Sequence, residues 1–174
     1  MKTAKEIGIA GAIVALLISL QLVLSGVAGV ELVTVITVSY AYYFGVKRAL
    51  ITNLSYSLLR CFVFGFSPNV IVLYIVYYCL IALFFGFLGK KLGANVTLKK
   101  LVVIVILSCL FTALFTVLDN LITPLITGMS LNGFKVYFLS SLPVMGVGVI
   151  NACVTVSLLF YPLLKLYSSV YPSN

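Results

Sequence analysis

Long apolar runs alternate with short polar or glycine-containing breaks along this chain. An α-helix needs about 20 predominantly apolar residues to cross a bilayer, and helices in such runs hold all their backbone hydrogen bonds internally. The pattern predicts helical spans at residues 7–24, 31–46, 49–66, 70–88, 101–127 and 138–166. We therefore expect an all-α integral membrane protein, folded as one compact bundle of six transmembrane helices over residues 1–174.

The run at 101–127 carries polar side chains at intervals of three or four residues, and Asp119 is the charged one. At 3.6 residues per turn these positions form one stripe of a helix. They are Ser108, Thr112, Thr116, Asp119, Asn120, Thr123 and Thr127. A carboxylate in hydrocarbon costs about 2.5–3.5 kcal/mol on insertion scales, so this stripe should face the protein interior.

Composition supports the membrane assignment. The chain is 63% hydrophobic and 8% charged, whereas soluble domains carry about 25% charged residues. The net charge of +8 comes from short cationic clusters between apolar runs, which is the positive-inside pattern of a multi-pass cell membrane protein rather than a nucleic-acid-binding surface. With both termini in the cytoplasm, the cytoplasmic segments hold Lys2, Lys5, Lys47, Arg48, Lys90, Lys91, Lys99, Lys100 and Lys165.

This orientation puts most of the unusual side chains in the outer halves of the spans. Gln21 and Tyr137 belong to this set. The candidates for binding are Glu31, Arg60, Asn69, Tyr74, Tyr77, Tyr78, Asp119, Asn120 and Lys135, with Asn151 nearer the middle. Arg60 and Asp119 either pair to hold two helices together or line a cavity. The tyrosines are either an interfacial aromatic belt or the walls of a pocket. Few polar residues lie in the inner halves, which favours a one-sided substrate-binding site formed by these residues over a continuous channel.

Small residues share one face of the first predicted span, at spacings of three and four. They are Gly8, Gly11, Ala12, Ala15 and Ser19. Such a face lets another helix approach closely. That helix belongs either to this chain or to a second protein.

Four segments resemble the N-terminal half of a known family: Gly-Val-Glu-Leu-Val-Thr at 29–34, Phe-Gly-Val-Lys-Arg at 44–48, Phe-Gly-Phe-Ser-Pro-Asn at 64–69, and Gly-Phe-Leu-Gly-Lys-Lys at 86–91. With the six-span layout, they resemble the substrate-binding S component of an energy-coupling factor (ECF) transporter. The resemblance implies high-affinity capture of a vitamin or related micronutrient. The layout is similar to the branch that includes cobalamin carriers, and pyridoxine, hydroxymethylpyrimidine, pantothenate and queuosine precursors remain open as ligands. It also implies that the small-residue face docks on a transmembrane scaffold (T) subunit, and that the S component then reorients in the membrane.

In that family two partner ATPase subunits use ATP, so the resemblance implies no catalytic residue and no directly bound cofactor in this chain. The chain has no histidine, and Cys61, Cys79, Cys109 and Cys153 lie in predicted spans without close pairing, so we expect no metal site. Three other functions remain as alternatives. They are a small membrane channel, a scaffold for another membrane protein, and an intramembrane enzyme, which would lack the usual histidine base.

Overall fold

The computed structural model describes residues 4–26, 32–93 and 96–171, and every regular element in them is an α-helix. The helices are α1 (Ala4–Leu24), α2 (Val33–Phe44), α3 (Val46–Leu59), α4 (Cys61–Phe64), α5 (Pro68–Leu92), α6 (Leu98–Thr127) and α7 (Leu131–Val170). The all-α expectation is therefore confirmed for the described part of the chain.

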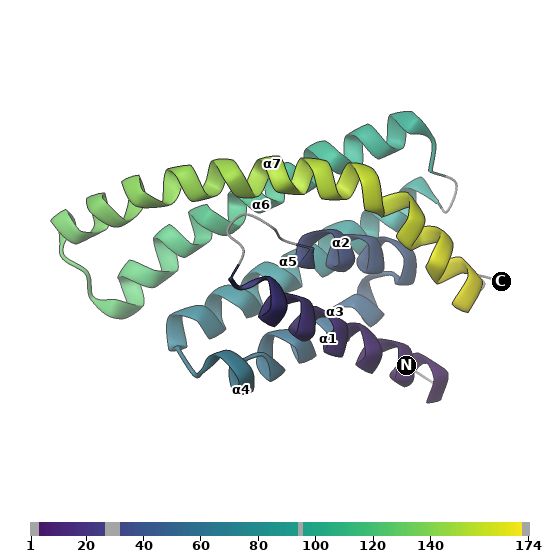
Figure 1. Cartoon of the computed structure of the whole chain (residues 1–174), viewed down its shortest axis with the longest axis horizontal. Coiled ribbons are helices and arrows are strands. Elements are labelled where there is room, and N and C mark those ends of the chain that lie inside the picture. Colours follow the sequence, from purple (N-terminus) through teal and green to yellow (C-terminus); the bar gives the residue numbers. More distant parts are fainter. Residues whose placement is uncertain (1–3, 27–31, 94–95, 172–174) are drawn as a thin grey trace.

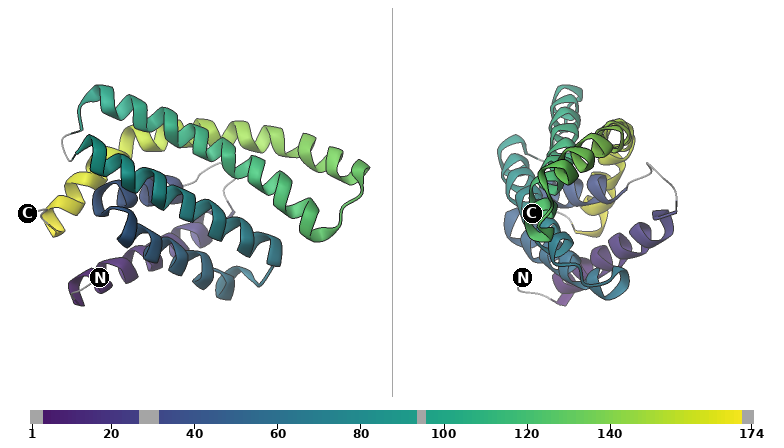
Figure 2. Two further views of the ribbon diagram at one scale, coloured as in Figure 1. Left: turned by 180° about the vertical axis from the view of Figure 1, so that it is seen from behind. Right: turned by 90° about the vertical axis from the view of Figure 1, so that its left-hand side faces the viewer.

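The helices lie roughly along one long axis (Figure 1). α6 and α7 run side by side along one flank, α1, α3 and α4 occupy the opposite flank, and α2 and α5 lie between them (Figures 1 and 2). The N- and C-terminal ends lie at the same end of the molecule, together with the α2–α3 and α5–α6 connections (Figure 1). We call this the terminal end, and the end with the α6–α7 connection the distal end.

Helix α2 forms the centre of the bundle. Every residue from Val33 to Tyr42 is buried, and α2 contacts α1, α3, α5, α6 and α7. Its polar side chains are satisfied locally: the Thr37 hydroxyl donates to the carbonyl oxygen of Val33 at 2.8 Å. At 1.5 Å rise per residue, the 12 residues of α2 extend only about 18 Å, less than the roughly 30 Å of bilayer hydrocarbon.

Glycine allows the close packing around α2. Gly45 has φ +79°, a conformation that side-chain-bearing residues rarely adopt, and it lets α3 start directly after α2. On α5, a Cβ at Gly89 would lie 2.0 Å from the carbonyl oxygen of Tyr42, and one at Gly86 would lie 2.6 Å from the Val46 nitrogen. Only glycine fits at these two positions of α5.

Four helices, α1, α5, α6 and α7, are long and apolar enough to cross a membrane. The predicted second span shortens to α2, and the third divides at Arg60 into α3 and α4. The number of spans, six, therefore stays a prediction.

Helix α7 extends the last predicted span in both directions to 40 residues. The polar connection expected at residues 128–137 contracts to Gly128–Ser130, because the Ser130 hydroxyl oxygen accepts a hydrogen bond from the Gly133 backbone N–H at 3.2 Å and caps α7. Farther along, α7 bends in its yellow part (Figure 1), the part of the helix that contains Pro162, which lacks a backbone N–H donor.

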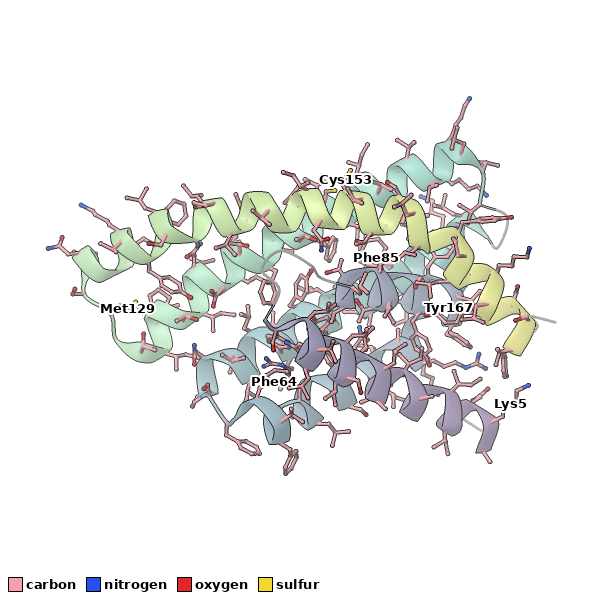
Figure 3. The ribbon with its side chains drawn as sticks, in the orientation of Figure 1. Lys5, Phe64, Phe85, Met129, Cys153 and Tyr167 are labelled. Atoms are coloured by element: carbon pink, nitrogen blue, oxygen red, sulfur yellow. The ribbon has the colours of Figure 1, made fainter. Side chains whose placement is uncertain are left out.

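Charged and aromatic side chains join the two chain ends. Arg48 forms an ion pair with Glu6, and the Tyr171 hydroxyl donates to the same Glu6 carboxylate at 2.9 Å. Lys5 lies at this terminal end, whereas Phe64 and Met129 lie toward the distal end (Figure 3). The basic residues of the last turn of α5 and the first turn of α6 also belong to the terminal end, which is the segregation of charge that the sequence pattern predicts.

Candidate functional site

A hollow of about 400 Å³ opens among α1, α2, α3, α5 and α6, toward the distal end. Its lining includes Arg60, which lies between α3 and α4, together with aromatic side chains of four helices, α3, α4, α5 and α6. We call it the Arg60 hollow. The side chains that matter most for its chemistry are Gln21, Tyr56, Arg60, Tyr74, Tyr78 and Phe115.

Arg60 is 8% exposed, yet none of its partners among the described residues is a carboxylate. Its Nε donates to the side-chain oxygen of Gln21 at 3.1 Å, and its Cζ lies 3.9 Å from the ring centroid of Tyr74. The ring centroid of Phe64 lies 4.8 Å from the same Cζ atom. Aromatic faces attract a cation, but they do not neutralise it. Within the described part of the chain, this nearly buried positive charge therefore has no acidic partner.

Gln21 fixes the geometry of this site. Its Oε1 accepts a 2.6 Å hydrogen bond from the Tyr56 hydroxyl as well as the bond from Arg60, and its Nε2 donates to the Tyr74 hydroxyl at 2.9 Å. One amide thus connects α1, α3 and α5. The sequence pattern placed Gln21, the only glutamine of the chain, in the outer leaflet but did not single it out as a binding residue, and it did not indicate Tyr56.

The tyrosines of α5 are packed inside the protein. Tyr77 and Tyr78 are each 2% exposed, and Tyr74 is half-buried, so an interfacial belt does not describe them. Tyr74 and Tyr78 line the Arg60 hollow, with ring centroids 5.3 Å apart. The Tyr77 ring instead packs edge-on against the Phe115 ring, with ring centroids 4.8 Å apart. Tyr77 thus contacts a residue that lines the hollow.

A second hollow, of about 350 Å³, lies between α6 and α7 and contains Asp119. We call it the Asp119 hollow. The Tyr137 hydroxyl donates to Asp119 Oδ2 at 2.5 Å, and the Thr123 hydroxyl donates to Oδ1 at 2.6 Å. Asn69 on α5 donates to the Thr123 oxygen at 3.2 Å. Phe115 lines both hollows and stands between the two charges.

Four of the ten predicted binding residues line these hollows, and they do not share one: Arg60, Tyr74 and Tyr78 line the first, and Asp119 lines the second. Arg60 and Asp119 form no ion pair in the part of the chain that the structure describes, so they do not staple two helices together. Asn120, 4% exposed, donates to the Ser141 hydroxyl oxygen at 2.7 Å. Lys135 is exposed and Asn151 is half-buried on α7, and neither lines these two hollows. Glu31 lies outside the described residues.

The small-residue face of α1 is open. Its members are all exposed: Gly8, Gly11, Ala12, Ala15 and Ser19. A Cβ built at Gly8 or Gly11 would meet no neighbouring atom within 4 Å. Gly11 and Ala15 also line an apolar groove of about 600 Å³ between α1 and α3–α4. The face thus does not pack tightly against the described helices of this chain, and its docking on a second protein stays a prediction.

Within residues 4–26, 32–93 and 96–171, no group of three His, Cys, Asp or Glu side chains gathers where a metal ion could bind. No family model matches this chain, and neither the curated proteins nor the solved structures contain a match to it.

Proposed function

We propose that this protein is the substrate-capturing membrane subunit of an ECF-type importer, and that it binds a vitamin or related micronutrient in the Arg60 hollow. The observation that carries the proposal is the hollow itself: an almost buried guanidinium, held by Gln21 among aromatic walls, at the end opposite the cationic clusters. Its volume of about 400 Å³ falls within the roughly 300–1,000 Å³ of small-molecule sites.

The packing of the terminal half supports capture from one side rather than conduction. Three aromatic rings pack against one another there in tilted and edge-on arrangements, with ring centroids 4.5 to 6.1 Å apart. They belong to Tyr40, Phe44 and Tyr167. A channel requires polar or hydrated surface at every depth. With the cationic terminal end in the cytoplasm of a prokaryotic cell, the hollow would face the exterior, and both chain termini would be inside.

The exposed small-residue face of α1 supports docking on the T subunit of an ECF module. Glycine and alanine let a partner helix approach closely, and Gly11 lies beside the apolar groove. The T subunit and two ATPase subunits would supply the energy, so this chain would hydrolyse no ATP itself. The apolar residues exposed around the remaining perimeter fit a subunit that reorients within lipid.

The size of the hollow favours a micronutrient of one or two rings. A corrinoid is several times larger than 400 Å³, so a small pyridine or pyrimidine vitamin fits the Arg60 hollow better than cobalamin. The aromatic side chains of α5 and α6 provide flat surfaces for such a ring.

Ligand binding by the purified protein tests this function. In dodecyl maltoside and without ATP, one member of a panel of vitamins and their precursors should bind with submicromolar affinity by calorimetry. Co-expression with an ECF module should yield a stable complex. Absence of any binder, combined with ligand-free ion conductance in liposomes, would establish a channel instead. Obligate co-purification with a partner that has no ATPase would establish a scaffold protein.

A further inference from the structure

We propose that the solute of the Arg60 hollow is an anion, with a carboxylate or phosphate attached to a flat ring, and that the terminal nitrogens of Arg60 bind the anionic group. The inference deepens the proposed function and rests on it, because it assigns a chemical class to the solute captured in this hollow.

Charge balance is the first argument. The described residues contain two acidic side chains, and both are engaged elsewhere. Glu6 pairs with Arg48 at the terminal end, and Asp119 accepts hydrogen bonds from Tyr137 and a threonine in the other hollow. Arg60 therefore keeps its positive charge at 8% exposure with no acidic partner in the described chain. Burial of an unpaired charge is costly, and an anionic ligand would offset that cost.

The orientation of the guanidinium is the second argument. Its Nε donates to Gln21, and its Cζ lies 3.9 Å from the centroid of the Tyr74 ring. The two terminal nitrogens have no hydrogen-bond partner among residues 4–26, 32–93 and 96–171, although the side chain lines the hollow. Paired N–H groups of this planar fork match the two oxygens of a carboxylate or phosphate. A positioned, partly unused donor set therefore faces the space where a ligand would lie.

The walls give the third argument. Tyr74, Tyr78 and Phe115 line the same hollow, and the Tyr74 ring centroid lies 5.3 Å from that of Tyr78 and 5.8 Å from that of Phe115. Aromatic groups prefer offset or edge-on contacts of this kind. A ring that carries its charge at one edge would reach Arg60 while its faces remain against the tyrosines.

Benzoate and benzamide are a matched pair of probes for this arrangement, because they share a flat ring and differ in charge. The wild-type protein in dodecyl maltoside, which contains no phosphate, would be titrated with each at millimolar concentrations by calorimetry and thermal unfolding. We expect saturable binding of benzoate and at least about tenfold weaker binding of benzamide, equivalent to about 1.4 kcal/mol. Equal binding of the two, or no effect of benzoate at tens of millimolar, would overturn the proposal without any variant.

Variants then assign the effect to Arg60. Arg60→Gln should weaken benzoate binding at least tenfold, and Arg60→Lys, which keeps the charge but loses the fork, should retain part of it. Lys135→Gln is the matched control, since this exposed cation lies outside both hollows and its removal should leave the benzoate affinity within about twofold. Benzoate binding that survives Arg60→Gln in a folded protein would refute the assignment.

Two further outcomes separate this inference from the proposed function. A neutral vitamin that binds tightly and independently of Arg60 would overturn the anion inference and leave the importer function standing. Conversely, Arg60-dependent benzoate binding in a protein that forms no complex with an ECF module would support the anion site and contradict the importer function. If phosphatidylglycerol, but not benzoate, stabilises the protein through Arg60, the site holds a lipid phosphate and the solute assignment is wrong.

Discussion

Replacement of Gln21 by glutamate changes the charge of the Arg60 hollow with almost no change in shape. The new carboxylate would retain the oxygen that accepts from Arg60 Nε at 3.1 Å and from the Tyr56 hydroxyl at 2.6 Å. The hollow would then contain an internal ion pair. An incoming anion about 5 Å from that carboxylate would meet a repulsion of about 3 kcal/mol at an effective dielectric constant of about 20. We expect the affinity for benzoate to fall by about 100-fold.

Calorimetric titration of Gln21→Glu with benzoate and benzamide measures this effect. The affinity for benzamide should change by less than about threefold, because a neutral ligand interacts only weakly with the new charge. Gln21→Met is the matched control for shape: it removes the hydrogen bonds to Tyr56 and Tyr74 without adding a charge, so it should weaken benzoate less than glutamate does. Benzoate affinity in Gln21→Glu within threefold of wild type would show that the charge of Arg60 does not govern binding.

Three other substitutions test separate parts of the structure. Gly11→Leu should reduce co-purification with a co-expressed ECF module at least tenfold, whereas Gly146→Leu, at an equally open glycine on α7, should not; similar losses in both would contradict docking through α1. Gly89→Ala should lower stability by at least about 2 kcal/mol in thermal unfolding, because its Cβ would lie 2.0 Å from a backbone oxygen of α2, and an unchanged melting temperature would disprove that close approach. Tyr137→Phe, which removes the 2.5 Å hydrogen bond to Asp119, should cost about 1.5–3 kcal/mol of stability but leave benzoate affinity within twofold; a large loss of affinity would show that the two hollows act as one site.

Helical periodicity predicted the burial of four of the seven polar residues in the α6 stripe, whereas Thr116 and Asp119 are half-buried and Thr127, in the last turn, is exposed. Ser108, Thr112, Asn120 and Thr123 are all less than 9% exposed, and Ser108 donates to the carbonyl oxygen of Ile104 one turn earlier. The positions of side chains around one helix depend only on 3.6 residues per turn. The sequence pattern was therefore sufficient for this feature, as it was for the approximate positions of the helices.

The ends of helices were less predictable than their existence. Gly45 terminates α2 after 12 residues, and a capping serine starts α7 at Leu131, inside the stretch expected to be a polar connection. A capping contact between neighbouring residues can extend a helix beyond its apolar run. The alternation of apolar and polar segments does not carry that information.

The sequence by itself determined that this protein is helical and apolar, which residues share a face of each helix, and where its cations cluster. Only the tertiary structure decided that Arg60 meets Gln21 and Tyr74 rather than Asp119, and that the two charges occupy separate hollows on either side of Phe115. The reason is physical. Periodicity describes the rotation of residues about a single helix axis, whereas the partner of a buried side chain depends on how helices distant in sequence are rotated and placed against one another.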